Sequence, residues 1–174
     1  MKSLTLPLSA RDIADLHAGD AVLLSGVIYT ARDCAHRRIF ELLDAGKPLP
    51  FPLDGAFIFY AGPCPAPDGK ASGSCGPTTS ARMNIFAPRL LDSGLHGIIG
   101  KGEMSEDVRL ALRRNHRVYF AAIGGAGAIY GNAVLKSECV AFPKLESEAI
   151  YRLEVKDFPL IVAIDAEGKS VYKR

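Results

Sequence analysis

One segment limits the folds open to this chain: residues 21–29, a mostly apolar run followed directly by a helix-start pattern. Val, Leu and Ile dominate the run, as expected of a strand that is buried on both faces. Thr30 and Asp33 then have the spacing of a capping box. We therefore expect a helix to begin there and to end at Gly46, where glycine favours termination. A doubly buried strand that leads into a helix is typical of α/β folds.

The rest of the chain repeats this alternation of apolar runs and helix signals. We expect strands at 2–9, 56–61, 97–100, 118–123, 138–142, 149–155, 160–165 and 170–172. We expect helices from Ser9 to Leu16, from 79 to 87, from 105 to 115 and from 124 to 136. Pro88 either kinks the second of these helices or starts another short helix to Ser93. The strands at the end indicate a mixed sheet or a small second sheet. No repeat or linker divides the chain, so residues 1–174 are expected to form a single domain.

Composition excludes several classes of protein. The 174 residues are 48% apolar and carry a net charge of +2, which indicates neither disorder nor a nucleic-acid or membrane surface. No apolar run is long enough to cross a bilayer, and residues 1–8 are too short and polar for a signal peptide. We therefore expect a cytoplasmic protein.

The four cysteines, Cys34, Cys64, Cys75 and Cys139, form no C-x-x-C pair. Free thiols in a reducing compartment are the default interpretation of such isolated cysteines. Cys34, Cys64 and Cys75 could in principle supply three thiolates to an iron–sulfur cluster, but their spacing does not require one.

A candidate anion site lies after the turn Gly76-Pro77. Thr78 or Thr79 has the character of a helix N-cap, and Arg82 follows Thr78 by one helical turn. A hydroxyl, a guanidinium and the positive end of a helix would then meet at one point, which favours an anion. An ordinary capped helix with a solvated arginine is the alternative.

Two further cations stand at the ends of expected strands. Arg32 follows the buried strand, and in α/β folds ligands gather at that junction. Lys101 stands between Gly100 and Gly102, where small residues allow the backbone to approach a ligand. We expect Arg32, Arg82 and Lys101 to share one accessible cleft, without a protein carboxylate to balance them. A solvated first-turn residue remains the alternative for Arg32.

Two glycine-rich segments carry weaker signals. The Gly-Lys-Gly turn lacks the frame of a nucleotide P-loop. Residues 124–127, Gly-Gly-Ala-Gly, lack the order of a dinucleotide loop, and close packing of a helix on the sheet explains their glycines as well. The long loop 62–76 holds three prolines and four glycines, and loops of that length are usually functional or mobile.

Four motifs together resemble one family. They are Thr30-Ala31-Arg32-Asp33-x-Ala35-His36-x-Arg38, Gly76-Pro77-Thr78-Thr79-Ser80-x-Arg82-Met83, Gly100-Lys101-Gly102 and Asp157-Phe158-Pro159. The sequence is similar, from Leu6 to Tyr172, to the β-subunit or C-terminal domain of iron–sulfur-dependent class I fumarate hydratases and L-tartrate dehydratases. The resemblance implies an α/β fold of the swivelling β/β/α type with a mixed sheet.

The resemblance also implies a partner. In that family an α-subunit or N-terminal domain holds a four-iron–four-sulfur cluster on three cysteines, and the β part closes the active site. No cysteine of this chain matches a cluster ligand, which argues against the three-cysteine site. Because the chain begins at Met1 just before the β-type region, we expect the separate-subunit form, with possible homodimerisation within a heterotetramer.

The site residues follow from the motifs. By resemblance, Arg32, Arg82 and Lys101 hold the substrate carboxylates, and Thr78 is the proposed general base that removes the C3 proton while the open iron binds the leaving hydroxyl. A helix N-terminus, Arg82 and Lys101 would stabilise the Thr78 alkoxide. Thr78 donating a hydrogen bond to substrate is the alternative. The general acid lies in the partner, and neither Cys75 nor the loop 62–74 receives a role.

The resulting hypothesis is a β-subunit of a hydro-lyase, active only with its α-subunit, that hydrates fumarate reversibly to (S)-malate. A tartrate dehydratase β-subunit is the first alternative, with the same mechanism and one more substrate hydroxyl. A non-catalytic swivelling domain that binds a small anion or an assembly partner is the second.

Overall fold

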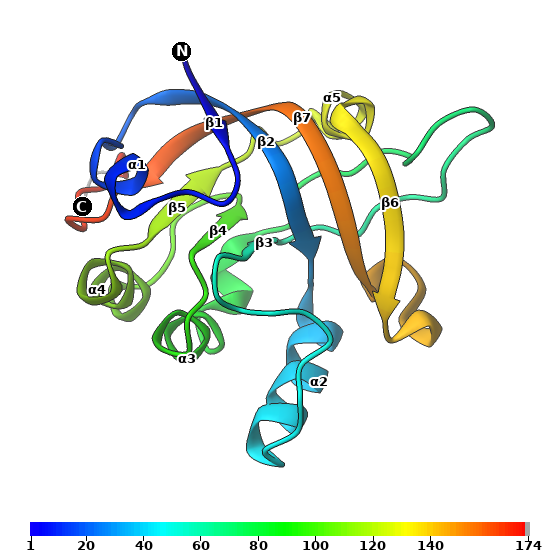
Figure 1. The fold of residues 1–174 in the computed structure, drawn as a ribbon, viewed down its shortest axis with the longest axis horizontal. Coiled ribbons are helices and arrows are strands. Elements are labelled where there is room, and N and C mark those ends of the chain that lie inside the picture. Colours follow the sequence, from blue (N-terminus) through cyan, green and yellow to red (C-terminus); the bar gives the residue numbers. More distant parts are fainter. Residues whose placement is uncertain (173–174) are drawn as a thin grey trace.

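A computed structural model of the chain, in which residues 1–172 are described, is built around one mixed sheet of seven strands (Figure 1). The strands are β1 (Lys2–Thr5), β2 (Ala21–Thr30), β3 (Phe57–Phe59), β4 (Gly97–Gly100), β5 (Val118–Ala121), β6 (Val134–Ala141) and β7 (Ile150–Ile164). Their order is β1-β2-β3-β4-β5-β7-β6, and β2 also pairs with β7. The extra pairing joins the two halves of the sheet into a closed path of strands. The α/β class and the mixed sheet are as the sequence predicts.

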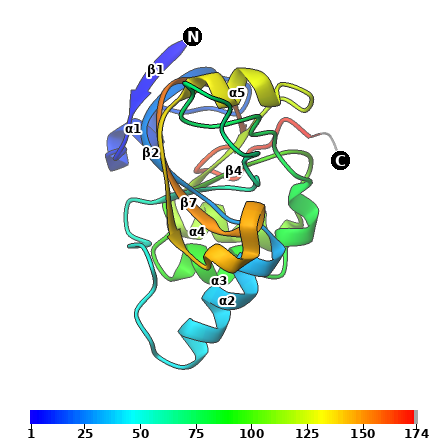
Figure 2. The same ribbon diagram turned by 90° about the vertical axis from the view of Figure 1, so that its right-hand side faces the viewer.

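The long strand β7 makes this closure. Residues 152–161 of this strand run antiparallel to β2, from Tyr29 opposite Arg152 to Ala21 opposite Ile161. On its other side the first half pairs with β6 and the second half pairs with β5. The sheet therefore folds over itself, with β1, β2, β6 and β7 above β3, β4 and β5 (Figures 1 and 2).

The helices of residues 1–172 are α1 (Ala10–Ala14), α2 (Asp33–Asp44), α3 (Ala87–Asp92), α4 (Glu106–Asn115) and α5 (Gly127–Ala133), with the 3-10 turns η1 (Ser80–Met83) and η2 (Pro143–Glu148). Three of the five helices, α2, α3 and α4, form a third layer below the short parallel strands (Figure 1). Figure 1 shows α2, α3 and α4 along the lower side and α5 at the opposite side of the molecule. No helix within residues 1–172 is long and apolar enough to cross a membrane.

Two hydrophobic cores result from the alternation of side chains along the middle strands. On β3, Phe57 and Phe59 point into the core between the two sheet layers, whereas Ile58 points to the helices. Val118 and Phe120 do the same on β5, with Tyr119 on the helix side. All of these side chains are fully buried. This period of two explains why such short strands are apolar throughout.

Strands β2, β3, β4 and β5 are mutually parallel, so their carboxyl ends share one edge of the sheet. The segment from Pro77 to Ser80 lies along that edge. Pro77 forms an isolated bridge with Ala61, after β3, and Thr79 forms one with Lys101, after β4. This edge holds the segments that the sequence motifs mark.

Most predicted elements are present, and one capping box is confirmed. The Ser9 hydroxyl accepts a hydrogen bond from the Asp12 amide at 3.1 Å, and the Asp12 carboxylate accepts one from the Ser9 amide at 2.8 Å. These two bonds satisfy amide donors at the start of α1, which begins where its local signal places it.

The capping box predicted at Thr30 is wrong. Thr30 is the last residue of β2, and its hydroxyl accepts a hydrogen bond from the Tyr151 amide at 3.1 Å. Arg32 is the N-cap of α2 and makes no side-chain cap. Instead the distant Glu148 carboxylate accepts the Cys34 amide at 3.3 Å. The β2–β7 pairing takes Thr30, so the cap comes from another segment.

The helix predicted at 79–87 is also wrong. The chain forms only the four-residue 3-10 turn η1, and α3 begins separately at Ala87. The backbone bonds of residues 77–80 to β3 and β4 prevent a helix from starting at Thr78 or Thr79.

Three smaller differences lie in the second half. Val134–Lys136, predicted as the end of a helix, belong to β6, because they pair with β7. The strands predicted at 149–155 and 160–165 are one strand, β7. The strand predicted at 170–172 is reduced to a single bridge between Ile164 and Ser170.

Candidate functional site

The site is built on the carboxyl ends of parallel strands. Arg32 follows β2 by two residues, and Lys101 follows β4 directly. Both are therefore carried to the same edge of the sheet, the edge at which ligands bind in open α/β sheets.

The segment that carries Thr78 is held between the ends of β3 and β4 by backbone hydrogen bonds. The Thr78 amide donates to the Tyr60 carbonyl at 2.7 Å. The Ser80 amide donates to the Lys101 carbonyl at 2.9 Å, and the Ser80 hydroxyl accepts from the Lys101 amide at 2.8 Å. Thr78 is thus placed by two strands that are distant from it in sequence.

Arg82 lies against Thr78. Its Nη2 donates to the Thr78 Oγ1 at 2.6 Å, and its Nε lies 3.3 Å from Oδ1 of Asp33. The Arg82 side chain is 48% exposed, so its guanidinium faces solvent as well as the two partners. Thr79, the N-cap of η1, makes no side-chain cap. Since no α-helix begins here, the helix dipole expected at this site is absent from it.

The glycines around Lys101 have local structural reasons. A Cβ on Gly100 would lie 2.0 Å from the Ser80 Oγ, and Gly102 has φ +85°. Only glycine tolerates the first contact, and glycine is favoured at such a φ. A Cβ on Gly124, which follows β5, would lie 3.0 Å from Cδ of Lys101. The lysine stem therefore runs along the glycine turn after β5.

Arg32 is half-buried at the first turn of α2. Its Cδ would be 3.3 Å from a Cβ on Gly62, and its Nε is buried without a hydrogen-bond partner among residues 1–172. The Arg32 stem is thus packed against the chain after β3, with one donor still unsatisfied. A buried unsatisfied donor of this kind is a binding capacity that a ligand can use.

His36 supports the backbone of Arg32 from the core. Its Nδ1 lies 2.8 Å from the Arg32 carbonyl, so Nδ1 carries the proton and donates to that oxygen. The imidazole is fully buried beside Tyr60 and Phe86, with ring centroids 5.4 and 5.2 Å apart. Burial lowers the pKa of His36 to about 4, against the opposing effects of the Arg32 carbonyl and Asp33. The imidazole is therefore neutral at pH 7.

The expectation that no carboxylate balances the cations is wrong. Asp33, the neighbour of Arg32, pairs with Arg82 across the site. The sequence pattern assigns Asp33 to a capping box. Its position next to Arg32 in the first motif is the feature that could have indicated a place in the site. Arg32 and Lys101 form no ion pair with the residues described here. Arg82 contacts both Thr78 and Asp33. Lys101 is linked to Ser80 through its backbone, and Arg32 adjoins Asp33 in the chain.

The cysteines do not form a metal site. Cys34 Sγ lies 3.5 Å from the Glu148 carboxylate, and burial raises its pKa. Burial raises the pKa of Cys75 to about 12, and a protonated thiol is a poor ligand. Cys64 and Cys139 are exposed. Within residues 1–172 no group of three His, Cys, Asp or Glu side chains is close enough to hold a metal. The donor set does not fit an iron–sulfur cluster.

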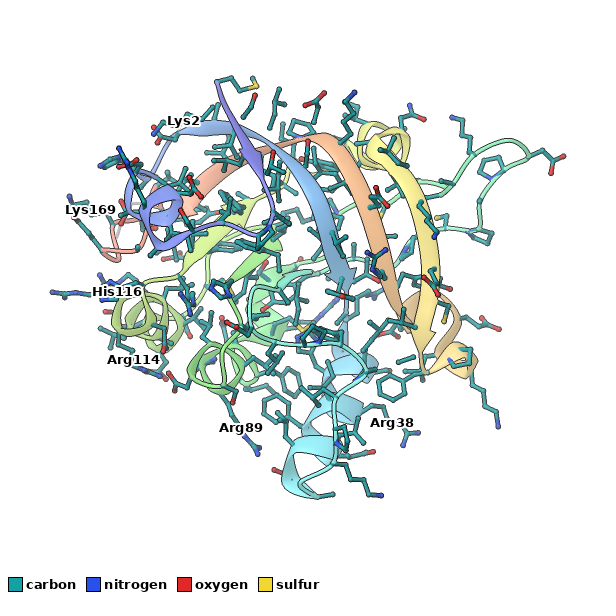
Figure 3. The ribbon with its side chains drawn as sticks, viewed as in Figure 1. Lys2, Arg38, Arg89, Arg114, His116 and Lys169 are labelled. Atoms are coloured by element: carbon teal, nitrogen blue, oxygen red, sulfur yellow. The ribbon has the colours of Figure 1, made fainter. Side chains whose placement is uncertain are left out.

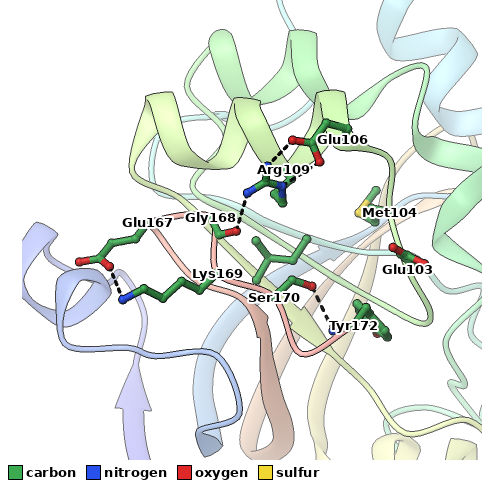
Figure 4. A pocket seen from close by; sticks show the side chains of 10 residues that line it. Glu103, Met104, Glu106, Arg109, Glu167, Gly168, Lys169, Ser170 and Tyr172 are labelled. Carbon is green, nitrogen blue, oxygen red and sulfur yellow. Dashed lines mark hydrogen bonds and ion pairs between the residues drawn. The ribbon is translucent and has the colours of Figure 1, made fainter. Parts of the chain in front are cut away.

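A separate hollow of about 530 Å³ lies beside α4 and the end of β7 (Figure 4). Its cations are paired within the hollow. Arg109 donates from Nε to Glu106 at 2.8 Å and from Nη1 to the Gly168 carbonyl at 3.0 Å. Lys169 pairs with Glu167 at 2.7 Å. None of the four predicted site residues lines this hollow.

The fold and the strand-edge cluster define an α/β domain that carries cationic side chains at the carboxyl ends of its parallel strands. Residues 2–174 match the protein family described as Fumarase C-terminus. The chain belongs to that family.

Named relatives fall into two groups. The chain is 40% identical over 153 residues to "Fumarate hydratase class I, anaerobic" of Escherichia coli, covering 87% of this chain and 28% of that protein. It is 40% identical over 174 residues to "Putative L(+)-tartrate dehydratase subunit beta" of Methanocaldococcus jannaschii, covering 95% and 88%. It is 34% identical over 175 residues to "L(+)-tartrate dehydratase subunit beta" of E. coli, covering 98% and 86%.

These relatives are hydro-lyases by name, one group named as hydratases and the other as dehydratases. The chain spans less than a third of the length of the fumarate hydratases that it matches. Family membership therefore concerns the part of those enzymes to which this chain corresponds.

Proposed function

We propose that this chain is the β part of a hydro-lyase that adds water reversibly to fumarate to give (S)-malate. Membership of the Fumarase C-terminus family supports the reaction class. The observation that carries the proposal is the contact between Arg82 and Thr78, with Nη2 2.6 Å from Oγ1, at the edge where Arg32 and Lys101 emerge. The Thr78 hydroxyl thus contacts one cation, and two more follow the strands on either side of β3.

The cations match a dicarboxylate. Arginine offers planar paired donors to a carboxylate, whereas lysine offers a compact charge. Among residues 1–172, Arg32 keeps an unsatisfied buried Nε, and Arg82 uses Nε and Nη2 on its partners Asp33 and Thr78. Arg32, Arg82 and Lys101 are the proposed contacts of the two carboxylates.

Thr78 is the proposed general base. In the dehydration direction its oxygen would take the C3 proton of malate. A free hydroxyl is a poor base and needs activation. The Arg82 guanidinium, donating to Oγ1, favours the negative form of that oxygen. The alternative role, a hydrogen bond from Thr78 to substrate, makes a different kinetic prediction, given in the Discussion.

A partner completes the proposed enzyme. Two relatives are named as beta subunits, so we propose an α part that holds the four-iron–four-sulfur cluster and the general acid. The cysteines of this chain do not fit the cluster, which supports that division. Homodimerisation of the β part within a heterotetramer and a cytoplasmic location, in keeping with four free thiols, belong to the same proposal.

A second substrate deserves the same test. The chain matches two tartrate dehydratase β-subunits over 95% and 98% of its length. Tartrate differs from malate by one hydroxyl, and the same cations would hold its carboxylates.

The test is the chain co-expressed with a cysteine-bearing α part, purified without oxygen and offered fumarate, malate and both tartrates. Turnover of fumarate and malate supports the proposal. If the complex turns over tartrate alone, tartrate is the substrate instead of fumarate. If an assembled, cluster-loaded complex turns over none of them, the chain is a non-catalytic anion-binding domain. The chain purified alone with iron and sulfide is the control. We expect it to bind no cluster and to show no activity. A bound cluster, or turnover without the α part, would contradict the division of roles.

A further inference from the structure

Asp33 holds the guanidinium that contacts Thr78. Arg82 is a flexible side chain on a short 3-10 turn, and its side chain is 48% exposed. Such a side chain samples several rotamers unless it is held. The Asp33 Oδ1 lies 3.3 Å from its Nε, while the Thr78 Oγ1 accepts from Nη2 at 2.6 Å. Two contacts on different nitrogens define the orientation of the planar group.

The position of Asp33 is itself well determined. Asp33 is the first residue of α2, whose N-terminal amide at Cys34 is held by Glu148. The carbonyl of Arg32 accepts a hydrogen bond from buried His36. The Asp33 side chain is 28% exposed, less than that of its partner Arg82. The carboxylate is therefore the more fixed member of the pair.

Asp33 is the acidic residue in the first turn of α2, a position that the helix dipole favours. The N-cap of α2 makes no side-chain cap hydrogen bond, and the Asp33 ion pair crosses to η1 rather than along its own helix. We propose that Asp33 is a positioning residue, which orients Arg82 so that one face of the guanidinium activates Thr78 and the remaining donors meet a substrate carboxylate. This inference rests on the proposed function.

The chain offers a matched control on the same helix. Asp44, the last residue of α2, pairs with Arg89 of α3, with Oδ1 2.6 Å from Nη1. Figure 3 shows Arg89 pointing away from the body of the molecule on the helical side. The Asp44–Arg89 pair has the same chemistry as the Asp33–Arg82 pair but involves none of the predicted site residues.

The experiment uses the assembled enzyme, with Asp33→Ser, Asp33→Asn and Asp44→Ser. Serine is well tolerated at a helix start but is too short to reach Arg82, whereas asparagine keeps an oxygen at the same distance. We expect Asp33→Ser to lower kcat/KM on the accepted substrate about 10- to 100-fold, as for residues that orient a functional side chain. Asp33→Asn should stay within about fivefold of wild type, and Asp44→Ser should not change kcat/KM. If Asp33→Asn falls as far as Asp33→Ser at unchanged thermal stability, contact with the side-chain oxygen does not orient Arg82, and the inference is overturned.

Epistasis separates positioning from a merely structural role. In an Arg82→Ala background, Asp33→Ser should lower kcat/KM further by less than about twofold, because the effects of substitutions at contacting residues in one network are not additive. An equal loss in both backgrounds overturns the inference.

Crystal structures of the wild-type and Asp33→Ser assemblies give a readout that needs no activity. Arg82 should leave Thr78 only in the variant, and retention of the contact overturns the inference. If wild-type enzyme turns over no substrate, the proposed function fails, and this structural comparison still decides the role of Asp33.

Discussion

Two charged regions of this molecule look alike in composition and differ in how their charges are used. The hollow beside α4 contains Arg109 and Lys169, and each has a carboxylate partner within the hollow (Figure 4). The strand-edge site contains Arg32, Arg82 and Lys101, with Asp33 as the one carboxylate paired to them among residues 1–172. The hollow is neutralised by its own side chains, whereas the strand edge keeps cationic capacity for a ligand. Cations without carboxylate partners, rather than the volume of a hollow, are the reason why we propose the substrate site at the strand edge.

Thr78→Ala is the strongest test of the difference between the two regions, because the lining of the hollow has no counterpart of the Thr78–Arg82 contact. If Thr78 is the base, kcat should fall roughly 10²–10⁴-fold with KM little changed. Steady-state kinetics of the assembled enzyme measure this.

Thr78→Ser is the control, since it keeps the oxygen and should retain far more activity than alanine. Near-normal kcat in Thr78→Ala would assign Thr78 to substrate contact alone and would require another base.

Lys101→Met and Lys169→Met compare one lysine from each region. Loss of a charged hydrogen bond to substrate costs about 1.5–3 kcal/mol, so Lys101→Met should raise KM on the order of 10- to 100-fold. Lys169→Met removes a lysine that already pairs with Glu167 and should leave KM unchanged. Equal effects in kinetic assays would show that the strand edge is not the substrate site.

Gly100→Ala and Gly168→Ala compare two glycines whose replacement should cost similar stability. A Cβ on Gly100 would lie 2.0 Å from the Ser80 Oγ, and Gly168 has φ +81°. Overpacking and left-handed strain each cost about 1–3 kcal/mol. Thermal unfolding should therefore shift alike, but only Gly100→Ala displaces Ser80 and Lys101 and should lower kcat/KM. Normal catalysis by Gly100→Ala would contradict the Ser80–Lys101 link.

The smallest effect concerns His36, which lies beneath the strand edge. Burial lowers its pKa in the folded protein to about 4, below the ordinary value of 6.5. The unfolded chain then binds more protons between these values, so the stability contribution is present above pH 6.5 and is lost as pH falls towards 4. Between pH 7 and pH 5 the loss is roughly 2 kcal/mol.

His36→Asn keeps a donor near the Nδ1 position and removes the titration. Its unfolding temperature should depend less on pH than that of wild type over this range. In the hollow, the Lys169 side chain lowers the pKa of Glu167. If the unfolding temperatures of wild type and His36→Asn fall in parallel as pH is lowered, His36 is not the source of the lost stability.

Local patterns in the sequence determined much of the fold. The apolar run of β2, the alternation in β3 and β5, the serine cap of α1 and the helix that ends at Asn115 all depend on neighbours within a few residues. Such neighbours are visible in the sequence. The four candidate residues were likewise marked by short motifs, and the structure carries them to one edge because parallel strands share their direction.

Only the tertiary structure decided which partner each polar group takes. Thr30 and Asp33 have capping-box spacing, yet Thr30 bonds β7 and Asp33 pairs with Arg82. Thr78 and Thr79 have the character of N-caps, yet backbone bonds to Tyr60 and Lys101 hold the segment extended. A hydroxyl or carboxylate satisfies a local amide or a distant group equally well, and the closure of the sheet by β7 determines which of the two is within reach.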